Sequence, residues 1–401
     1  MTEPTRITSI KDLKAALQLA VGLELSTVPV YLTGLYSIDT GGNTDATQTI
    51  RSVVMEEMLH MTLAANVLNA LGEIPSTAPV DFHGRRNLSP IPAYPLDSPL
   101  ITGIGTLELL PLTPHAVDGF VRIEHPLHGA ATLGDIPAQP GGFRTIGEFY
   151  EAVDAALADP AICPDSAFQP VRQIPDSEYY GGAGHVVEVK DRATAREAVL
   201  KIIDQGEGLP EECLHRPAKT VTDADRLGSG WQMYSHYARF RELQAGRRFR
   251  TDQQAGEHPE GALLLIDYSA VRPALYVPRN GDVDGSPEGA ALDAFDLAYS
   301  HLVDDIYRAF AGRPVEVTDP LDPHAERERP ALRLAVHAMY GLKNAATALM
   351  RTPNPAKPGH TLCPRFSYVP PGGDRDKLVQ RLENRTDNRT DNHTDNRGGQ
   401  P

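Results

Sequence analysis

The sequence predicts a mainly α-helical protein built around an antiparallel bundle of four helices. Three observations predict it: two long apolar stretches with helical spacing near the N-terminus, a Glu and a His three residues apart inside the second stretch, and helical patterns that recur to about residue 350. We also expect a long irregular insertion between the second and third bundle helices, at about 75–190, and extra helices toward the C-terminus.

Length, composition and charge limit the class of protein. With 401 residues, 41% hydrophobic and 23% charged, the chain is typical of a globular protein of one or two domains. A formal net charge of −15 argues against binding to nucleic acid or an anionic membrane, because both attract basic patches. The three cysteines are far apart, and no signal-peptide pattern or uninterrupted apolar span is evident. We therefore expect a cytoplasmic protein.

The first two bundle helices are expected at 9–38 and 46–71. Ser9 is a suitable N-cap for the first, and the leucines that follow recur at helical spacing. Pro29 interrupts this helix and predicts a kink, because proline removes one backbone hydrogen bond. The second helix is apolar around most of its circumference and ends at Gly72, so we expect it to be deeply buried.

The rest of the chain alternates Pro-rich stretches with helical patterns. The insertion contains short extended runs such as TLELLPL and one helix-like run, HAVDGFVRIEH. Further helices are expected at 145–157, 193–208, 223–246, 289–310 and 330–350. The helices at 193–208 and 223–246 are the expected third and fourth members of the bundle.

These patterns divide the chain into three parts. Residues 1–250 are the expected metal-binding bundle with its insertion, and residues 251–371 are a helical extension. Residues 372–401 end in NRTDNRTDNHTDNR, which contains no residue able to build a core. We therefore expect a disordered tail without a function.

Glu57 and His60 form an E-x-x-H pair in the second helix. A helix turns about 100° and rises about 1.5 Å per residue, so a three-residue step places both side chains on one face. Burying a carboxylate and an imidazole among apolar neighbours is unfavourable unless they are paired, and a bound cation removes most of that penalty. The motif alone is weak evidence, because such pairs also occur by chance on helix surfaces.

Other helices supply matching residues. The four-helix metal-binding template takes one Glu from each of two helices and an E-x-x-H pair from each of the other two. Five of its six positions are filled by the predicted ligands Glu24, Glu57, His60, Glu207 and His236.

The sixth position is occupied by Met233, whose thioether is a soft ligand that cannot bridge two hard metal ions. The sequence therefore leaves open a single metal ion, or a second one held by Glu56 or Gln232. Glu242 follows His236 by six residues, about 9 Å along a helix axis, so a salt bridge or a supporting contact is expected of it.

Tyr31, Tyr237 and Arg239 are candidate catalytic residues. The tyrosines lie near predicted ligands and could line a pocket or relay protons and electrons, although such tyrosines are more often packing residues. Arg239 could pair with a ligand carboxylate or a substrate acid, and an outward surface position is equally compatible with the pattern. His125 and His128 form an H-x-x-H pair around a proline, where a structural role is favoured.

Six stretches in chain order resemble one known family. They are LELSTVPVYLTGLYS, VVMEEMLHMTLAANVLNALG, TIGEFYEAV, DQGEG, SHYARF and PRFSYVP. They resemble the ferritin-like domain of iminophenyl-pyruvate dimer synthases of bisindole pathways and their stand-alone actinobacterial relatives, over residues 10–245 with a fainter likeness to 370. The resemblance implies a ferritin-like fold and oxidative coupling or oxygenation in secondary metabolism.

These observations predict an iron-dependent oxidase or oxygenase that uses dioxygen on a small substrate, which the resemblance implies is amino-acid-derived. Carboxylate and imidazole ligands suit iron, and manganese or zinc would also be accepted. Two alternatives stay open. One is a ferroxidase or iron-handling protein, although the long insertion and the extra C-terminal helices do not suit a compact cage subunit; the other is a non-catalytic scaffold, which Met233 favours. A homodimer is expected only from the general frequency of homodimers.

Overall fold

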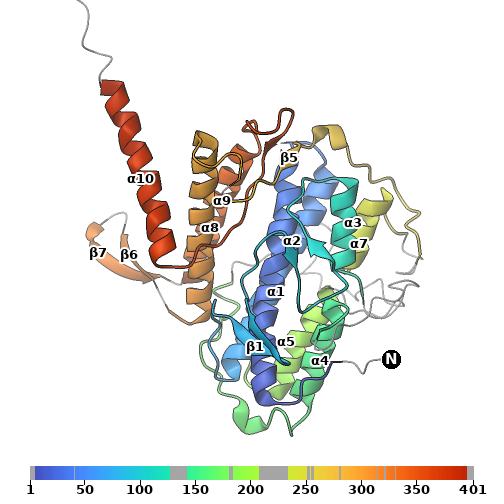
Figure 1. Ribbon diagram of the computed structural model, residues 1–401. Helices are drawn as coiled ribbons and strands as arrows, with labels where there is room; N and C mark the ends of the chain where they lie inside the picture. The colour runs from blue at the N-terminus through green and yellow to red at the C-terminus, as the bar shows by residue number, and fades with distance from the viewer. Residues whose placement is uncertain are drawn as a thin grey trace, which may run out of the picture.

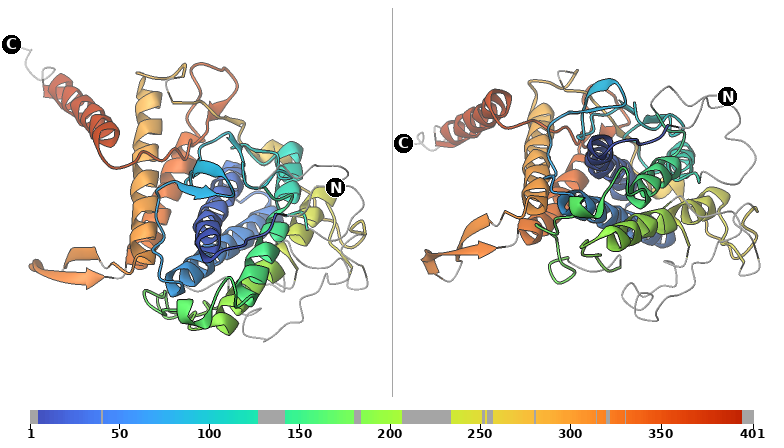
Figure 2. Two further views of the ribbon diagram at one scale, coloured as in Figure 1. Left: turned by 60° about the horizontal axis from the view of Figure 1, so that its bottom comes forward. Right: turned by 90° about the horizontal axis from the view of Figure 1, so that it is seen from below.

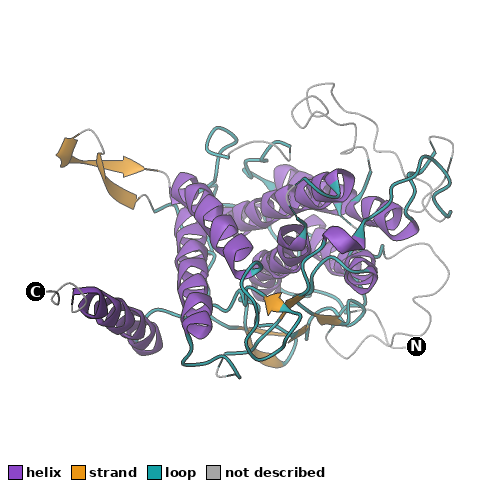
Figure 3. Ribbon diagram, turned by 90° about the horizontal axis from the view of Figure 1, so that it is seen from above, coloured by secondary structure: helices purple, strands orange, loops and turns teal. Residues whose placement is uncertain are grey.

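The computed structural model describes residues 5–39, 41–126, 142–179, 184–206, 234–250, 253, 257–279, 281–313, 315–319, 322–329 and 331–394. Helices dominate the described part of the chain, and the strands are short (Figure 3). This confirms the mainly helical class that the sequence predicts.

Two long helices, α1 (Ile10–Ser37) and α2 (Thr44–Ala70), pack along each other at the centre of the molecule (Figure 1). The side chain of Ser9 caps α1 by accepting a hydrogen bond from the N–H of Asp12. Both helices agree with the predicted ranges, and α1 continues through Pro29 as one element. By length and hydropathy α1 alone among the described helices could cross a membrane, but 83% of its most apolar window is buried, as in a core helix.

Four shorter helices form the other two sides of the bundle. They are α3 (Pro114–Ile123), α4 (Ile146–Ala158), α5 (Arg192–Gln205) and α7 (His236–Ala245). Helices α3 and α4 both pack against α1, and α5 and α7 both pack against α2. Across the bundle α3 pairs with α7 and α4 pairs with α5, so two of the described helices contribute to each of these two sides.

Two of these four helices belong to the stretch 75–190, where the sequence predicts a long irregular insertion between the second and third bundle helices. Helices α3 and α4 both pack on α1. They do so because each buries large side chains, among them Phe120 of α3 and Phe149 of α4. The expected third and fourth helices, at 193–208 and 223–246, contribute α5 and α7 to one and the same side of the bundle.

The Pro-rich stretch also forms two small antiparallel ribbons. One pairs β1 (Val80–Phe82) with β2 (Arg85–Leu88), and the other pairs β3 (Leu96–Asp97) with β4 (Thr106–Leu107). The ribbon β1–β2 lies against α1. A 3₁₀ turn, η1 (Asp165–Ala167), lies between α4 and α5.

The C-terminal part of the chain adds the expected extra helices. Helices α8 (Pro287–Phe310) and α9 (Ala331–Leu349) pack together and cover the side of α1 and α2 that faces away from α3 and α7 (Figure 1). The connection between them is an antiparallel hairpin of β6 (Val315–Asp319) and β7 (Asp322–Arg329). This second layer explains why α1 and α2 are apolar on almost every face.

Shorter elements complete this part. A 3₁₀ turn, η3 (Tyr268–Ala270), precedes β5 (Ala274–Leu275), which pairs in parallel with β8 (Thr361–Leu362). The last element, α10 (Gly373–Thr394), projects from the body of the molecule, as does the hairpin β6–β7 (Figure 2).

Helix α10 occupies the tail that the sequence pattern predicts to be disordered, so this prediction differs from the structure. The first turns of α10 are anchored: Leu378 is 1% exposed, and the guanidinium of Arg375 pairs with Asp304 of α8 and donates to the backbone oxygen of Val369. An ion pair and a backbone hydrogen bond therefore hold the start of this helix together with one buried apolar side chain.

Candidate metal centre

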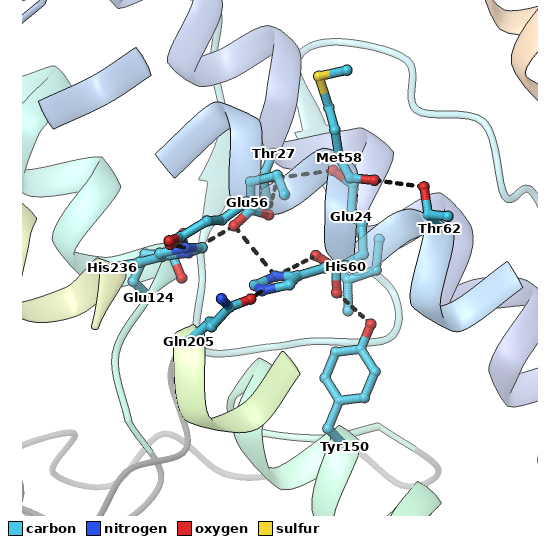
Figure 4. Close-up of polar contacts among 12 residues, drawn as sticks. Glu24, Thr27, Glu56, Met58, His60, Thr62, Glu124, Tyr150, Gln205 and His236 are labelled. Carbon is cyan, nitrogen blue, oxygen red and sulfur yellow. Dashed lines mark hydrogen bonds and ion pairs between the residues drawn. The ribbon is translucent and has the colours of Figure 1, made fainter. Parts of the chain in front are cut away.

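A cluster of acidic and imidazole side chains lies in the middle of the bundle, where the four short helices meet α1 and α2 (Figure 4). Each member is at most 3% exposed. The members are Glu24, Glu56, Glu57, His60, Glu124 and His236.

Glu57 lies at the centre of this cluster. Its Oε1 atom is 2.7 Å from Nδ1 of His236 and 3.8 Å from Nδ1 of His60, the latter because the E-x-x-H spacing directs both side chains to one face of α2. Its Oε2 atom accepts a hydrogen bond of 2.6 Å from the hydroxyl of Thr27 on α1. One carboxylate oxygen is thus held by α1 while the other faces both imidazoles.

A second carboxylate stands beside each imidazole. Nδ1 of His60 is 3.6 Å from Oε2 of Glu24, and Nδ1 of His236 is 3.5 Å from Oε1 of Glu124. The two rings stack with centroids 5.2 Å apart and an angle of 23° between their planes. The cluster therefore has two similar halves, Glu24 with His60 and Glu124 with His236, on either side of Glu57.

Two tyrosines fix the outer carboxylates. The hydroxyl of Tyr150, from α4, donates a short hydrogen bond to Oε1 of Glu24. The hydroxyl of Tyr31, from α1, donates a short hydrogen bond to Oε1 of Glu124, the residue that caps the C-terminus of α3. Each half of the cluster thus has a carboxylate oriented by a phenol.

Both imidazoles are oriented through their Nε2 atoms. Nε2 of His60 is 3.0 Å from Oε1 of Gln205 at the end of α5, and Nε2 of His236 is 2.8 Å from Oε2 of Glu56 (Figure 4). An acceptor at Nε2 leaves Nδ1 of each ring to face the central carboxylates.

Arg239 balances part of the acidity. The side chain is 1% exposed; Nη2 pairs with Oε2 of Glu56, and Nη1 donates a hydrogen bond of 2.8 Å to Oγ of Ser52. Of the two positions compatible with the sequence, the structure thus shows pairing with a carboxylate and not an outward surface position.

The electrostatics of the cluster favour uptake of positive charge. Burial raises the pKa of Glu57 well above its usual value, and the carboxylate of Glu124 raises it further. Burial opposes the protonated form of His236, but Glu124, Glu56 and Glu57 outweigh it, so the pKa of His236 is raised well above its usual value. The buried carboxylates exceed the one buried guanidinium, and protons or a cation must balance the excess.

These residues fit a divalent metal. Oε1 of Glu57 and Nδ1 of His236 are buried and lie 2.7 Å apart, and neither atom has a hydrogen bond of good geometry to any residue that the structure describes. Together with His60 they offer ligand atoms that all lie within 4.8 Å of one another. Carboxylate oxygen and imidazole nitrogen are donor types that iron, manganese and zinc accept.

The structure brings together four of the five ligands predicted from the sequence. They are Glu24, Glu57, His60 and His236. The fifth, Glu207, lies outside the described residues, as do Met233 and Gln232. The last described residue before it, Gly206, lies against the cluster: a Cβ atom built there would be 3.9 Å from Cε1 of His60.

Sequence reasoning missed Glu124, Tyr150, Thr27 and Gln205. The four-helix template expects the sixth ligand three residues before His236, whereas the structure supplies an acid from the end of α3. The available signal was the helix-like run HAVDGFVRIEH, whose apolar spacing resembles that of a buried helix and in which Glu124 is the second-to-last residue.

The candidate catalytic residues have different positions. Tyr31 and Arg239 contact carboxylates of the cluster. Tyr237 lies at its edge, with its ring 5.3 Å from that of His125 and its hydroxyl accepting a hydrogen bond of 3.0 Å from Arg241.

Comparisons with known proteins agree with this architecture. A family model described as Ferritin-like matches residues 17–245, more than half of the chain. The 2-imino-3-(indol-3-yl)propanoate dimerase of Chromobacterium violaceum is 27% identical over 316 residues, which are 71% of this chain and 26% of that protein. The chain thus spans about a quarter of the length of this curated relative.

A solved structure extends the comparison to the fold. The crystal structure of a ferritin like protein from Caulobacter vibrioides matches with a TM-score of 0.53 at 20% identity, covering 91% of this chain and 100% of that one. At this identity the likeness concerns the fold, and it includes the C-terminal layer as well as the bundle.

Proposed function

The chain belongs to the ferritin-like family, and we propose that it is an iron-dependent enzyme that oxidises a small, amino-acid-derived carboxylic acid with dioxygen. The observation that carries this proposal is the buried cluster, in which carboxylates and two imidazoles converge on Glu57 at the centre of the bundle. Such an excess of buried negative charge is stable only with protons or a bound cation.

The two halves of the cluster suggest two adjacent metal positions. Glu24 and His60 would hold one metal, Glu124 and His236 the other, and Glu57 would be shared. Bound iron would supply the redox chemistry with dioxygen, which no side chain can supply by itself. Glu207 stays a predicted further ligand.

The remaining residues position these ligands and keep water out. Glu56 is committed to Arg239 and to Nε2 of His236, so we assign it the orienting of that ring instead of the direct metal contact left open for it by the sequence. Tyr31 and Tyr150 hold the outer carboxylates by hydrogen bonds. None of the cluster members is more than 3% exposed, so bulk water does not compete for the ligand atoms.

The substrate class is supported by the relative. The Chromobacterium violaceum protein is named for an imino acid that carries an indole ring and a carboxylate. We propose that this chain accepts an acid of the same general kind, an α-imino or α-keto acid derived from an amino acid, in a pathway of secondary metabolism.

The first test is metal content. The purified chain is loaded with ferrous iron under anaerobic conditions, excess metal is removed, and iron per chain is measured by elemental analysis for the native protein and for Glu57→Gln and His236→Ala. We expect two irons per native chain and loss of binding in both variants. Glu148→Gln, which removes an ion pair with the exposed Arg144 at the start of α4, is a matched control that should retain the metal.

The second test is reaction with dioxygen. An oxygen electrode records uptake by the iron-loaded chain with and without indole-3-pyruvate and ammonium, which form the imino acid in solution. Uptake that requires the organic acid supports the proposal. Uptake without it, with release of ferric iron, would favour the ferroxidase alternative, and a chain that binds no metal would favour the scaffold alternative.

A further inference from the structure

Beside the cluster, where α3 ends and α7 begins, lies a small group of aromatic and cationic side chains: His125, Tyr237 and Arg241. His125 directly follows Glu124, and Tyr237 directly follows His236, so both are chain neighbours of cluster members. Their rings lie 5.3 Å apart at an angle of 62°. The Cζ atom of Arg241, one turn further along α7, lies 5.7 Å from the centroid of the Tyr237 ring.

The two arginines of α7 differ in their partners. Arg239 pairs with Glu56, whereas no carboxylate among the residues that the structure describes pairs with Arg241. Nη1 of Arg241 donates to the hydroxyl of Tyr237, and its Nε is buried with no hydrogen-bond partner among the described residues. A guanidinium presents Nε and Nη2 along one edge, and that edge matches the two oxygens of a carboxylate. In Arg241 the hydrogen bond to Tyr237 holds the guanidinium in place, and within the described ranges this edge has no hydrogen-bond partner.

The charges around the cluster indicate what this edge of Arg241 can bind. An acid that approaches the metal-free cluster meets the carboxylates of Glu124 and Glu24, which would repel it in a site of low dielectric constant. Arg239 cannot offset this repulsion for a ligand, because it already neutralises Glu56. Arg241, one turn after Tyr237 on α7, supplies a cation that pairs with no acid in the described part of the chain.

We propose that Arg241 binds the carboxylate of the substrate through its Nε and Nη2 edge, and that Tyr237 and His125 form the aromatic wall that positions it. This inference rests on the proposed function, in that it assigns the residue that selects an acid for the same site. It makes the substrate a carboxylic acid by necessity: an amide or ester of the same shape lacks the charge that Arg241 recognises.

The test compares two probes of nearly equal shape, indole-3-propionate and the neutral indole-3-propionamide, by titration calorimetry on the full chain. We expect the native chain to bind the acid about tenfold or more tightly than the amide, because only the acid can form charge-assisted hydrogen bonds with the guanidinium of Arg241. In Arg241→Gln the acid should lose this advantage while binding of the amide is unchanged, and Arg241→Lys should recover part of it.

Arg247→Gln is the matched control, because Arg247 is exposed, donates to the backbone oxygen of Gly261 and lies past the end of α7. An acid that binds Arg241→Gln as well as the native chain would overturn the inference, and so would equal losses in both variants or a native chain that prefers the amide. Iron content and melting temperature of each variant are measured in parallel. A native chain that selects the acid through Arg241 but takes up no iron would overturn the proposed function alone.

Discussion

Glu24 illustrates how single residues determine this centre. It is 3% exposed on an otherwise apolar helix. Its Oε1 accepts a hydrogen bond from the hydroxyl of Tyr150, and its Oε2 lies 3.6 Å from Nδ1 of His60. A buried carboxylate in this position has a fixed orientation before a metal binds, so less conformational entropy is lost on binding.

Removing the hydroxyl of Tyr150 should therefore lower the affinity for metal more than it lowers the stability of the fold. We expect Tyr150→Phe to lower metal affinity about 10-fold to 100-fold, the range typical for loss of a partner that orients a ligand. Competition with a coloured chelator measures this affinity.

Tyr94→Phe is the control, since its buried hydroxyl donates a hydrogen bond of 2.6 Å to the backbone oxygen of Ser26 and not to the cluster. It should lose about 1–3 kcal/mol of stability with unchanged metal affinity. Equal effects of the two variants on affinity would contradict a specific role for Tyr150.

At the scale of elements, the long helices are predictable from the sequence, whereas the packing of the short helices is not. The apolar patterns of α1 and α2 extend over more than twenty residues each, so their existence depends little on other elements. Helices α3, α5 and α7 have 10, 14 and 10 residues. Helices this short are marginal alone and depend on tertiary packing, so the sequence could not show which of them face the cluster.

The same limit explains which site residues were found. Glu57 and His60 were predicted because both lie on one face of one long helix. Glu124 was missed because its position depends on how α3 pairs with α7, a contact between distant segments. Glu242 was expected to form a salt bridge, and its Oε2 accepts a hydrogen bond of 2.7 Å from Arg248.

Helix α8 holds the segment that leads to α10 through a row of polar contacts. Asp293 and Asp296 pair with Arg365 at 2.6 and 2.8 Å, and the hydroxyl of Ser300 accepts a hydrogen bond of 2.9 Å from the N–H of Val369. The PRFSYVP stretch is thus fixed to α8 by charge as well as by packing.

Asp296 should give this contact a dependence on pH. Burial raises its pKa to about 6, from the usual value of 3.8, against the opposing effect of Arg365 and Arg279. Between these values the folded chain retains a proton that the unfolded chain has lost, so stability falls as pH rises from about 4 to 6.

We expect this fall to amount to about 3 kcal/mol, because each unit of pKa difference corresponds to about 1.4 kcal/mol. Urea unfolding across this range should show a smaller fall for Asp296→Asn than for the native chain. Asp374→Asn, which alters an exposed acid of α10, should retain the native slope. Parallel slopes for the native chain and Asp296→Asn would exclude Asp296 as the cause.

At the scale of the whole molecule, the bundle is enclosed by a second layer. Helices α8 and α9 pack against α2 and α1, and the hydroxyl of Tyr276 donates a hydrogen bond of 2.8 Å to the backbone oxygen of Tyr94. Because the hydroxyl of Tyr94 donates to Ser26 of α1, hydrogen bonds connect the C-terminal part to the bundle. The sequence could predict this part only as additional helices.

Metal binding should therefore stabilise the molecule as a whole. A ligand that binds only the folded state adds about 2.7 kcal/mol at one hundred times its dissociation constant. We expect the melting temperature to rise by several degrees on anaerobic addition of ferrous iron and to return on chelation. Glu57→Gln should show no rise, and an equal rise in that variant would place the binding elsewhere.

The wide spacing of the cluster along the chain also fixes when during synthesis the centre can form. The contacts that build it join residues 93, 126 and 180 positions apart: Tyr31 to Glu124, Tyr150 to Glu24, and His236 to Glu56. A nascent chain that has released only α1 and α2 already carries Glu24, Glu57 and His60, yet it lacks Glu124 and His236. Contacts of such separation form late, so a ribosome must translate through α7 before the complete pocket for the metal exists.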